Sequence, residues 1–283
     1  MPYCLIFPGQ GSQFPGMSRG LTLMRSVDDG LRTLMEHGPE DELGQTVNAQ
    51  PAVLSVSVAL WEGSGLKDPA VVMGHSLGEY TALVAAGSLQ ADSALELVKK
   101  RAGFMDASSP KGAGSMAAVI GMSVHNIEEV ISKFSDLWVS NLNGASQVVI
   151  SGSIHAIDCA TPLLKEKGAR RVVPLKVTVA SHCPYMAHAR EALEGYLKGI
   201  KIKEPSCPVV SNVSARPEAD PGRIKVLLAE QLVSPVRFEE SVRAAAGLGI
   251  DRFIEIGPRC VLAPLVRRIA PGANVEVITN DEH

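Results

Sequence analysis

The sequence is short of aromatic residues, cysteines and long apolar runs, and these shortages narrow the classes of protein that it can encode. Aromatic side chains make up only 4% of the 283 residues, although apolar residues reach 46%, which is ample for a core. The five cysteines, Cys4, Cys159, Cys183, Cys207 and Cys260, are scattered, odd in number and form no Cys-x-x-Cys pair. This usage argues against a disulfide framework or a metal site and favours a reducing, cytoplasmic compartment.

An excess of charge of one sign is also missing. The net charge of −3 gives no argument for nucleic acid or an anionic membrane as a partner. No apolar run reaches the length of a membrane span, and no basic region precedes the short apolar stretch at the start, so we expect neither a membrane segment nor a signal peptide. The length suits one large domain, or one domain with a smaller one inserted.

The most informative stretch runs from Val71 to Tyr80 and reads as a strand, a sharp turn and a helix. Its Gly74-His75-Ser76-Leu77-Gly78 fits the Gly-x-Ser-x-Gly nucleophile elbow. A strand that reverses into a helix over one residue brings backbones close, and a Cβ at either glycine would collide. The turn would expose the Ser76 hydroxyl and place the Leu77 N–H at a helix N-terminus, where negative charge is stabilised. An ordinary helix start with a serine cap is the alternative that this pattern alone leaves open.

A glycine-rich loop, Pro8-Gly9-Gln10-Gly11-Ser12-Gln13, follows the first apolar strand, residues 5–7. No Gly-Lys-Ser/Thr follows it, so it is not a phosphate loop. It either offers backbone N–H groups beside a reaction centre or is a plain strand-to-helix turn.

An arginine falls on the apolar face of a predicted helix. With Asp92 as its N-cap, this helix runs from Ser93 to about Ala107, and Arg101 lies in the middle of its apolar stripe. A charge there is costly unless it is paired or reaches water. Arg101 therefore either packs its stem and frees its head, or points into a site to meet an anion.

Residues 116–180 predict the order β-α-β-β-α-β, the ferredoxin-like pattern. Their strands are expected at 116–122, 137–141, 147–150 and 171–179, and their helices at 124–134 and 154–167. Elsewhere apolar strands alternate with helices, which predicts a mainly parallel sheet covered on both faces. The strands expected there are 70–73, 208–212, 252–256 and 275–279, and the helices are two stretches in 17–47 broken near Gly38-Pro39, then 52–61, 221–232, 242–248 and 261–269.

The sequence thus predicts a large α/β subdomain, residues 1–115 and 182–283, and a small ferredoxin-like subdomain, residues 116–181. Ser181-His182-Cys183-Pro184 stands where the last small-subdomain strand gives way to a helix starting near Pro184. His182 would lie at the junction between subdomains, where ligand sites are commonly found. Cys183 is interpreted as a packing residue, with a nucleophile as the alternative because His182 precedes it.

Taken together, five motifs in this order resemble the malonyl-CoA:acyl carrier protein transacylases, a family that includes the acyltransferase domains of polyketide synthases. The motifs are Pro8-Gly9-Gln10-Gly11-Ser12-Gln13, Gly74-His75-Ser76-Leu77-Gly78-Glu79-Tyr80, Arg101-Ala102-Gly103-Phe104-Met105, Gln147-Val148-Val149-Ile150-Ser151-Gly152 and Ser181-His182. The resemblance runs from residue 3 to about residue 270, and the set is far more specific than any single motif. It implies an α/β-hydrolase-like core for the mainly parallel sheet.

The resemblance implies catalytic roles at matching positions. Ser76 would be the nucleophile that takes the acyl group from coenzyme A, and His182 the base that activates it and later the incoming thiol. The family has no third carboxylate, so the backbone carbonyl of Gln231 would orient His182. The backbone N–H groups of Gln10 and Leu77 would form the oxyanion hole.

The resemblance also implies how substrate is bound. Arg101 would pair with the free carboxylate of malonyl through two parallel bonds, which a lysine cannot make. His75, Asn143 and Met105 would line the site. The substrate would be a coenzyme A thioester, with no further cofactor, and the protein would be a monomer.

Two departures from the family pattern concern the entrance and the specificity. The stretch between Gln13 and Gln50 is shorter than in typical members, which bears on the shape of the entrance. Val179-Ala180-Ser181-His182 resembles both the fatty-acid enzymes and methylmalonyl-selective domains, whereas Leu77 after the nucleophile favours malonyl.

We therefore expect a transferase that moves malonyl from coenzyme A to the phosphopantetheine thiol of an acyl carrier protein, for fatty acid synthesis. A trans-acting acyltransferase of a polyketide synthase is the alternative, and a serine esterase a weaker one. An acidic carrier would dock on basic surface, unless those side chains are merely solvated. The candidates are Lys165, Lys167, Arg170, Arg171 and Lys176, with Arg267 and Arg268 as a second cluster.

Overall fold

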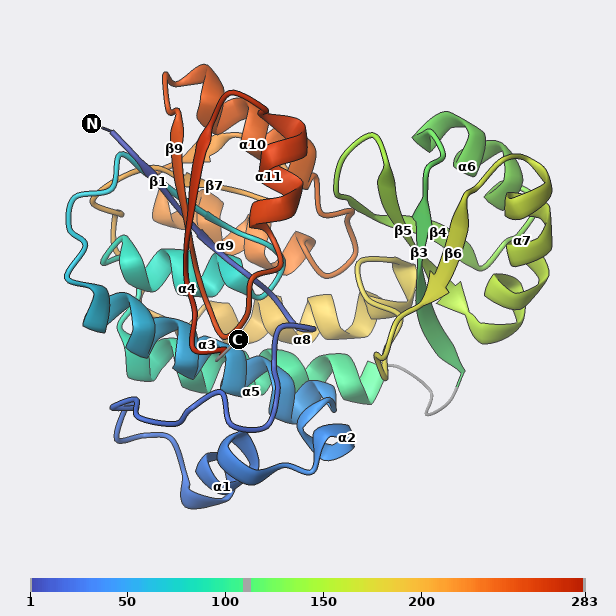
Figure 1. Ribbon diagram of the computed structural model, residues 1–283. Coiled ribbons are helices and arrows are strands. Elements are labelled where there is room, and N and C mark those ends of the chain that lie inside the picture. Colours follow the sequence, from blue (N-terminus) through green and yellow to red (C-terminus); the bar gives the residue numbers. More distant parts are fainter. Residues whose placement is uncertain (1, 109–112, 282–283) are drawn as a thin grey trace.

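The computed structural model describes residues 2–108 and 113–281 of the chain, and the strands of these residues form two separate sheets (Figure 1). The large sheet has six strands and is mainly parallel, whereas the small sheet has four antiparallel strands. The chain leaves the large sheet through helix α5 (Ala91–Ser108) and returns to it after strand β6 (Arg171–Pro174). This mixed α/β architecture confirms the expected combination of a mainly parallel sheet with a separate sheet.

Short apolar strands build the large sheet in the order β10-β9-β1-β2-β7-β8. The strands are β1 (Cys4–Phe7), β2 (Val71–Gly74), β7 (Val209–Val210), β8 (Pro217–Glu218), β9 (Arg252–Ile256) and β10 (Asn274–Ile278). Neighbours are parallel except β8, which pairs antiparallel with β7. Because the carboxyl ends of β1, β2 and β7 lie at one edge, the loops that follow them converge there.

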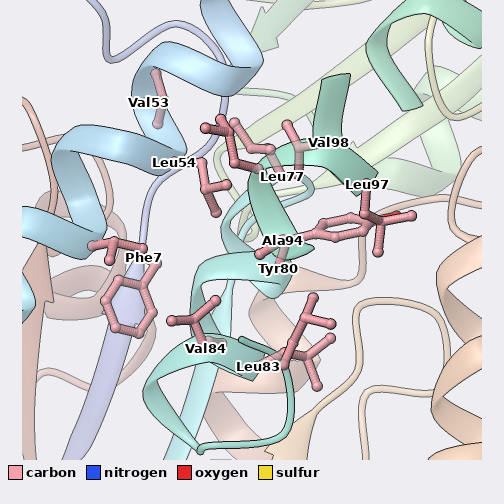
Figure 2. Close-up of a cluster of buried hydrophobic side chains, with 14 of the residues drawn as sticks. Phe7, Val53, Leu54, Leu77, Tyr80, Leu83, Val84, Ala94, Leu97 and Val98 are labelled. Carbon is pink, nitrogen blue, oxygen red and sulfur yellow. The ribbon is translucent and has the colours of Figure 1, made fainter. Parts of the chain in front are cut away.

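Helices cover both faces of the large sheet, as the continuous burial of β1 and β2 requires. Leu5 and Phe7 face one core, and Cys4 and Ile6 face the other, because side chains alternate along a strand. The first core contains residues of α1 (Asp29–His37), α2 (Glu40–Leu43), α3 (Thr46–Ser64), α4 (Gly78–Ala85), α5, α8 (Ala187–Leu197) and α9 (Pro221–Glu230). The second contains residues of α10 (Phe238–Gly247) and α11 (Ala263–Ile269). Figure 2 shows side chains from β1, α3, α4 and α5 meeting in the first core.

The small sheet has the predicted order β-α-β-β-α-β. Its elements are β3 (Gly114–Ile120), α6 (Val124–Ile131), β4 (Leu137–Leu142), β5 (Gln147–Ser153), α7 (Ile154–Glu166) and β6. The strands lie in the order β4-β5-β3-β6, and α6 and α7 pack on one face. The other face carries Met116, Ala118 and Val149. In Figure 1 this unit stands beside the large sheet. Strand β4 is hydrogen-bonded to the segment just before α10, from Leu142 N–H to Val236 O and from Val236 N–H to Ser140 O.

The N-terminal helices differ from the prediction. Residues 17–28 form turns and irregular backbone, and α1 begins only at Asp29, where the Asp28 side chain accepts from Leu31 N–H. The predicted break near Gly38-Pro39 is confirmed. Helix α3 begins at Thr46, so Pro51 lies inside it and does not mark its start.

Three further helix and strand ends differ from the prediction. Helix α5 begins at Ala91, so Asp92 lies in its first turn, where its Oδ1 accepts from Ser26 Oγ at 2.5 Å; it is not the N-cap. Strand β6 ends at Pro174, not at residue 179, because its pairing with β3 stops there. Before α8, Pro184–Met186 forms a short 3₁₀ turn. No helix within the described ranges is long and apolar enough to cross a membrane.

Candidate active site

The predicted elbow is present at the carboxyl end of β2, where the chain turns into α4. A Cβ on Gly74 would lie 1.9 Å from the carbonyl carbon of Gly78, and a Cβ on Gly78 would lie 2.0 Å from the carbonyl oxygen of Phe7. Both positions therefore require glycine, as the sequence predicts. Ser76 adopts φ 53°, a left-handed conformation that is strained for a residue with a side chain.

Ser76, His182 and Gln231 form a connected set. Ser76 Oγ lies 2.8 Å from His182 Nε2, and His182 Nδ1 lies 2.7 Å from the backbone oxygen of Gln231. A carbonyl only accepts, so Nδ1 carries the proton and Nε2 is free to accept one from the hydroxyl. Burial, and then the charge of Arg101, lowers the pKa of His182 to about 3. The imidazole is therefore neutral near pH 7.

Gln10 and Leu77 line the same cavity as Ser76. Within residues 2–108 and 113–281, the N–H groups of Gln10 and Leu77 donate no hydrogen bond. A Cβ on Gly9 would lie 2.5 Å from the carbonyl oxygen of His75, which shows how closely the glycine-rich loop lies against the elbow. Two free N–H groups next to a serine hydroxyl can stabilise an oxyanion.

Arg101 points inward, as its place on the helix predicts, and its side chain is 1% exposed. Its Nη1 donates to Gln50 Oε1 at 2.6 Å, and its Nη2 lies 3.0 Å from Gln231 Oε1 and 3.1 Å from Ser76 Oγ. All three partners are neutral. The guanidinium also lies 5.4 Å from the centre of the Tyr80 ring. A buried cation with neutral partners is suited to bind an anion.

The remaining predicted residues lie around the same space. His75 Nε2 lies 2.9 Å from Asn143 Oδ1, and Met105 Sδ accepts from Gln50 Nε2 at 3.4 Å. A cavity of about 260 Å³ has all nine predicted site residues except Gln231 in its wall. The small sheet and the segment after it supply one part of its apolar wall: Met116, Ala118, Val149, Leu175, Val177 and Val179. The segment at the start of α11 supplies another part: Val261, Leu262 and Leu265.

The sequence analysis missed several buried polar residues around the site, among them Gln50, Glu79 and Asn212. The carboxylate of Glu79 accepts from Asn212 N–H at 3.1 Å and from Gln231 Nε2 at 2.8 Å. Burial raises the pKa of Glu79 to about 7, against the lowering effect of these hydrogen bonds and of Arg101. Glu79 follows the elbow directly, so the Gly-x-Ser-x-Gly motif gave a signal for it, whereas none marked Asn212.

The other candidates are placed as follows. Cys183 is buried, and its thiol donates to Ala180 O at 3.2 Å, which fits a packing residue. In the first basic cluster Lys167 pairs with Glu129, whereas in the second Arg268 lines the cavity. Among the described residues, no group of three or more His, Cys, Asp or Glu side chains could hold a metal ion.

Comparison with known proteins identifies the family. The family model described as acyl transferase domain matches residues 4–278. The malonyl CoA-acyl carrier protein transacylase of Bacillus subtilis is 42% identical over 283 residues, which span 93% of this chain and 89% of the relative. The enzyme of the same name from Escherichia coli K12 is 38% identical, with 94% and 92% covered.

Solved structures of transacylases are also similar to this chain. A malonyl CoA-acyl carrier protein transacylase from Coxiella burnetii superposes with a TM-score of 0.92 at 35% identity, covering 99% of this chain and 95% of that one. A malonyl-transacylase solved in complex with a type II PKS acyl-carrier protein also has a TM-score of 0.92 at 35% identity, with 100% and 97% covered.

Proposed function

This chain belongs to the acyl transferase domain family, and from that premise we propose that it transfers malonyl from coenzyme A to the thiol of an acyl carrier protein. The observation that carries the proposal is the position of Ser76 Oγ, between the neutral His182 Nε2 and the buried guanidinium of Arg101. A hydroxyl with a base on one side and an anion-binding cation on the other suits a substrate that joins a reactive acyl carbon to a free carboxylate.

The first half-reaction loads the serine. Ser76 Oγ attacks the thioester carbon while His182 Nε2 takes the hydroxyl proton, and the N–H groups of Gln10 and Leu77 hold the oxyanion. When the carbon–sulfur bond breaks, His182 returns the proton to the coenzyme A sulfur. The product is a malonyl-serine ester and free coenzyme A.

The second half-reaction reverses these steps with another thiol. His182 takes the proton of the carrier's phosphopantetheine thiol, whose sulfur attacks the ester carbon. The carbon–oxygen bond to Ser76 breaks, and His182 returns the proton to Oγ. Because coenzyme A leaves before the carrier thiol attacks the malonyl-serine ester, the kinetics are ping-pong.

Arg101 selects the acyl group in this scheme. Its two Nη atoms present parallel donors that fit a carboxylate. Malonyl supplies that carboxylate, whereas acetyl would leave the guanidinium without an anionic partner. His75, Asn143 and Met105 complete the walls around the acyl chain. Preference for malonyl over methylmalonyl is part of the proposal, supported by the names of the relatives.

The carrier belongs to fatty acid synthesis in the main proposal. A carrier of a polyketide synthase is the second candidate, favoured by the similarity to a transacylase solved with a type II PKS acyl-carrier protein.

We further propose a cytoplasmic monomer without a cofactor beyond its thioester substrate. The proposal includes an α/β-hydrolase-like core at 1–115 and 182–283 and a small unit at 116–181, with the cavity between them, a division that the two sheets support. Met1 and residues 109–112, in the range 1–115, and residues 282–283, in the range 182–283, lie outside the described residues.

Intact-mass measurement tests the proposal. Incubation with malonyl-CoA should add one malonyl group to the wild type and to Cys183→Ala, and none to Ser76→Ala. Addition of holo carrier should then move the group to the carrier. Loss of the group to water at the same rate with and without carrier would instead indicate an esterase, and an adduct surviving in Ser76→Ala would exclude Ser76 as the nucleophile.

A further inference from the structure

A buried asparagine lies beside the elbow and is not used by the mechanism above. Strand β7 pairs in parallel with β2, with Val210 opposite Met73. Two residues further along, Asn212 therefore lies level with His75, at the carboxyl edge of the sheet where the elbow turns. Its side chain is fully buried, with 0% exposure.

Asn212 is hydrogen-bonded to the elbow on both sides of the turn. Its Oδ1 accepts from Ser76 N–H at 2.6 Å, and its Nδ2 donates to Gly74 O at 2.7 Å. Oδ1 also accepts from Gln231 Nε2 at 3.2 Å, and the backbone N–H of Asn212 donates to Glu79. The amide can take only this orientation, because its reverse would place the NH₂ group against two N–H donors and the oxygen against a carbonyl.

The strained turn needs such a partner. The glycines at 74 and 78 remove collisions, but they do not hold the peptide between His75 and Ser76 in place. A non-glycine residue at positive φ persists only where its surroundings fix it. Asn212 bonds the N–H of Ser76 itself and the carbonyl two residues before it, so it fixes the conformation at the residue that bears the reacting hydroxyl.

We propose that Asn212 is a positioning residue that holds the turn so that Ser76 Oγ faces His182 and the Leu77 N–H faces the cavity. Glu79 supports it, because one carboxylate oxygen accepts from both the Asn212 backbone and the Gln231 side chain. Asn212 touches no substrate in this role. The inference rests on the proposed acyl transfer, since it concerns the rate at which Ser76 is acylated.

The test compares Asn212→Ala with a matched asparagine elsewhere. Asn280 also uses its Nδ2 for two hydrogen bonds, to the carbonyls of Met17 and Arg19, and it does not line the cavity. Asn280→Ala should lower the melting temperature and leave the rate of acylation unchanged. Asn212→Ala should slow single-turnover acylation by saturating malonyl-CoA about a hundredfold, because small misplacements of reacting groups cost about this much. The affinity for free coenzyme A, measured by calorimetry, should stay within about twofold in both variants, since the proposal affects the turn and not the binding surface.

A second readout separates this inference from the proposed function. A small neutral phosphonofluoridate reacts with an activated serine without any acyl-CoA, and its rate of labelling at Ser76 should fall in Asn212→Ala in parallel with acylation. If the wild type takes no malonyl, the proposed function fails, while the labelling rates still decide the role of Asn212.

The outcomes that overturn the inference are definite. Asn212 is not a positioning residue if folded Asn212→Ala acylates or is labelled at the wild-type rate. The inference also fails if the affinity of Asn212→Ala for coenzyme A falls by the same factor as its rate of acylation. It fails as well if Asn280→Ala, with the same loss of melting temperature, is acylated as slowly as Asn212→Ala. Should Asn212→Ala not fold, Asn212→Asp replaces it, because it keeps the acceptor for Ser76 N–H and lacks the donor to Gly74. A wild-type labelling rate in that variant overturns the inference, and a slower rate supports it.

Discussion

Arg101 Nη2 lies 3.1 Å from Ser76 Oγ, so the guanidinium that would bind the substrate carboxylate contacts the hydroxyl that would attack the substrate carbonyl. The same hydroxyl lies 2.8 Å from His182 Nε2. The base, the nucleophile and the cation are therefore adjacent, with His182 and Arg101 buried and Ser76 partly exposed. The charge of Arg101 lowers the pKa of His182, and in the proposed reaction it would also select the acyl group.

Substitution of Arg101 should change acyl selectivity. Removing one partner of a buried ion pair costs about 3–5 kcal/mol, or two to four powers of ten in rate. Arg101→Ala should therefore lose most malonyl transfer and little acetyl transfer. The measurement is kcat/KM for malonyl-CoA and acetyl-CoA. Arg101→Lys, which keeps the charge without the two parallel donors, is the control. Its kcat/KM for malonyl-CoA should lie between those of the wild type and Arg101→Ala. An equal loss for both substrates in Arg101→Ala would mean that Arg101 is structural.

The rate of acylation should not fall near pH 6.5, where a histidine of ordinary pKa would be protonated. The pKa of His182 is about 3 in the free protein, so the base stays neutral from pH 8 down to pH 5. With acetyl-CoA, which leaves Arg101 without an anion, kcat/KM should show no acid limb from His182 in that range. In Arg101→Ala the cation is gone and an acid limb should move to higher pH. A limb near pH 6.5 in the wild type would contradict this prediction, provided that it persists in Glu79→Gln.

Glu79 should make the folded protein less stable as pH rises. Its pKa is raised from 4.5 to about 7, so the folded state keeps a proton that the unfolded state releases between these values. The free energy of unfolding attributable to Glu79 therefore falls through this window, by about 3 kcal/mol at 1.36 kcal/mol per pKa unit. Urea unfolding at pH 5 and pH 7.5 should show the decrease in the wild type and a smaller one in Glu79→Gln. Equal decreases would show that Glu79 does not titrate in this range.

The basic residues of α11 should contribute to carrier docking. Arg268 lines the cavity, whereas Lys167 and Lys176 of the other cluster pair with Glu129 and Glu40. An exposed ion pair is worth about 0.2–1 kcal/mol, so reversing two charges should lower kcat/KM for the carrier by about tenfold.

The docking experiment compares two double variants. The first carries both Arg267→Glu and Arg268→Glu, and the second carries both Arg170→Glu and Arg171→Glu. Transfer at subsaturating carrier should weaken with added salt in the wild type, because steering between exposed charges is screened. The first variant should be slower and less salt-dependent, and the second should resemble the wild type. If neither variant differs from the wild type, neither cluster docks the carrier.

Local patterns in the sequence determined much of this molecule. The glycines at 74 and 78 are required by a turn that involves only its own residues and the neighbouring strand, so the elbow could be predicted from its motif. Helical periodicity alone placed Arg101 on the buried face. Alternating apolar strands and helices predicted the two sheets, and errors arose mainly at ends such as those of α3 and β6, where pairing and packing, not propensity, decide the boundary.

The tertiary structure decided which polar groups support the site. Ser76 and His182 are 106 residues apart, and they meet because the chain returns from the small sheet to the edge where β1, β2 and β7 end. Gln50 lies in α3, Glu79 in the first turn of α4 and Asn212 just after β7. Only Glu79 has a local signal, its place directly after the elbow, and that signal does not show which groups its carboxylate contacts. Only the parallel register of β7 with β2 brings Asn212 onto the strained serine. A hydrogen bond between distant segments depends on that register, and no local pattern of residues encodes it.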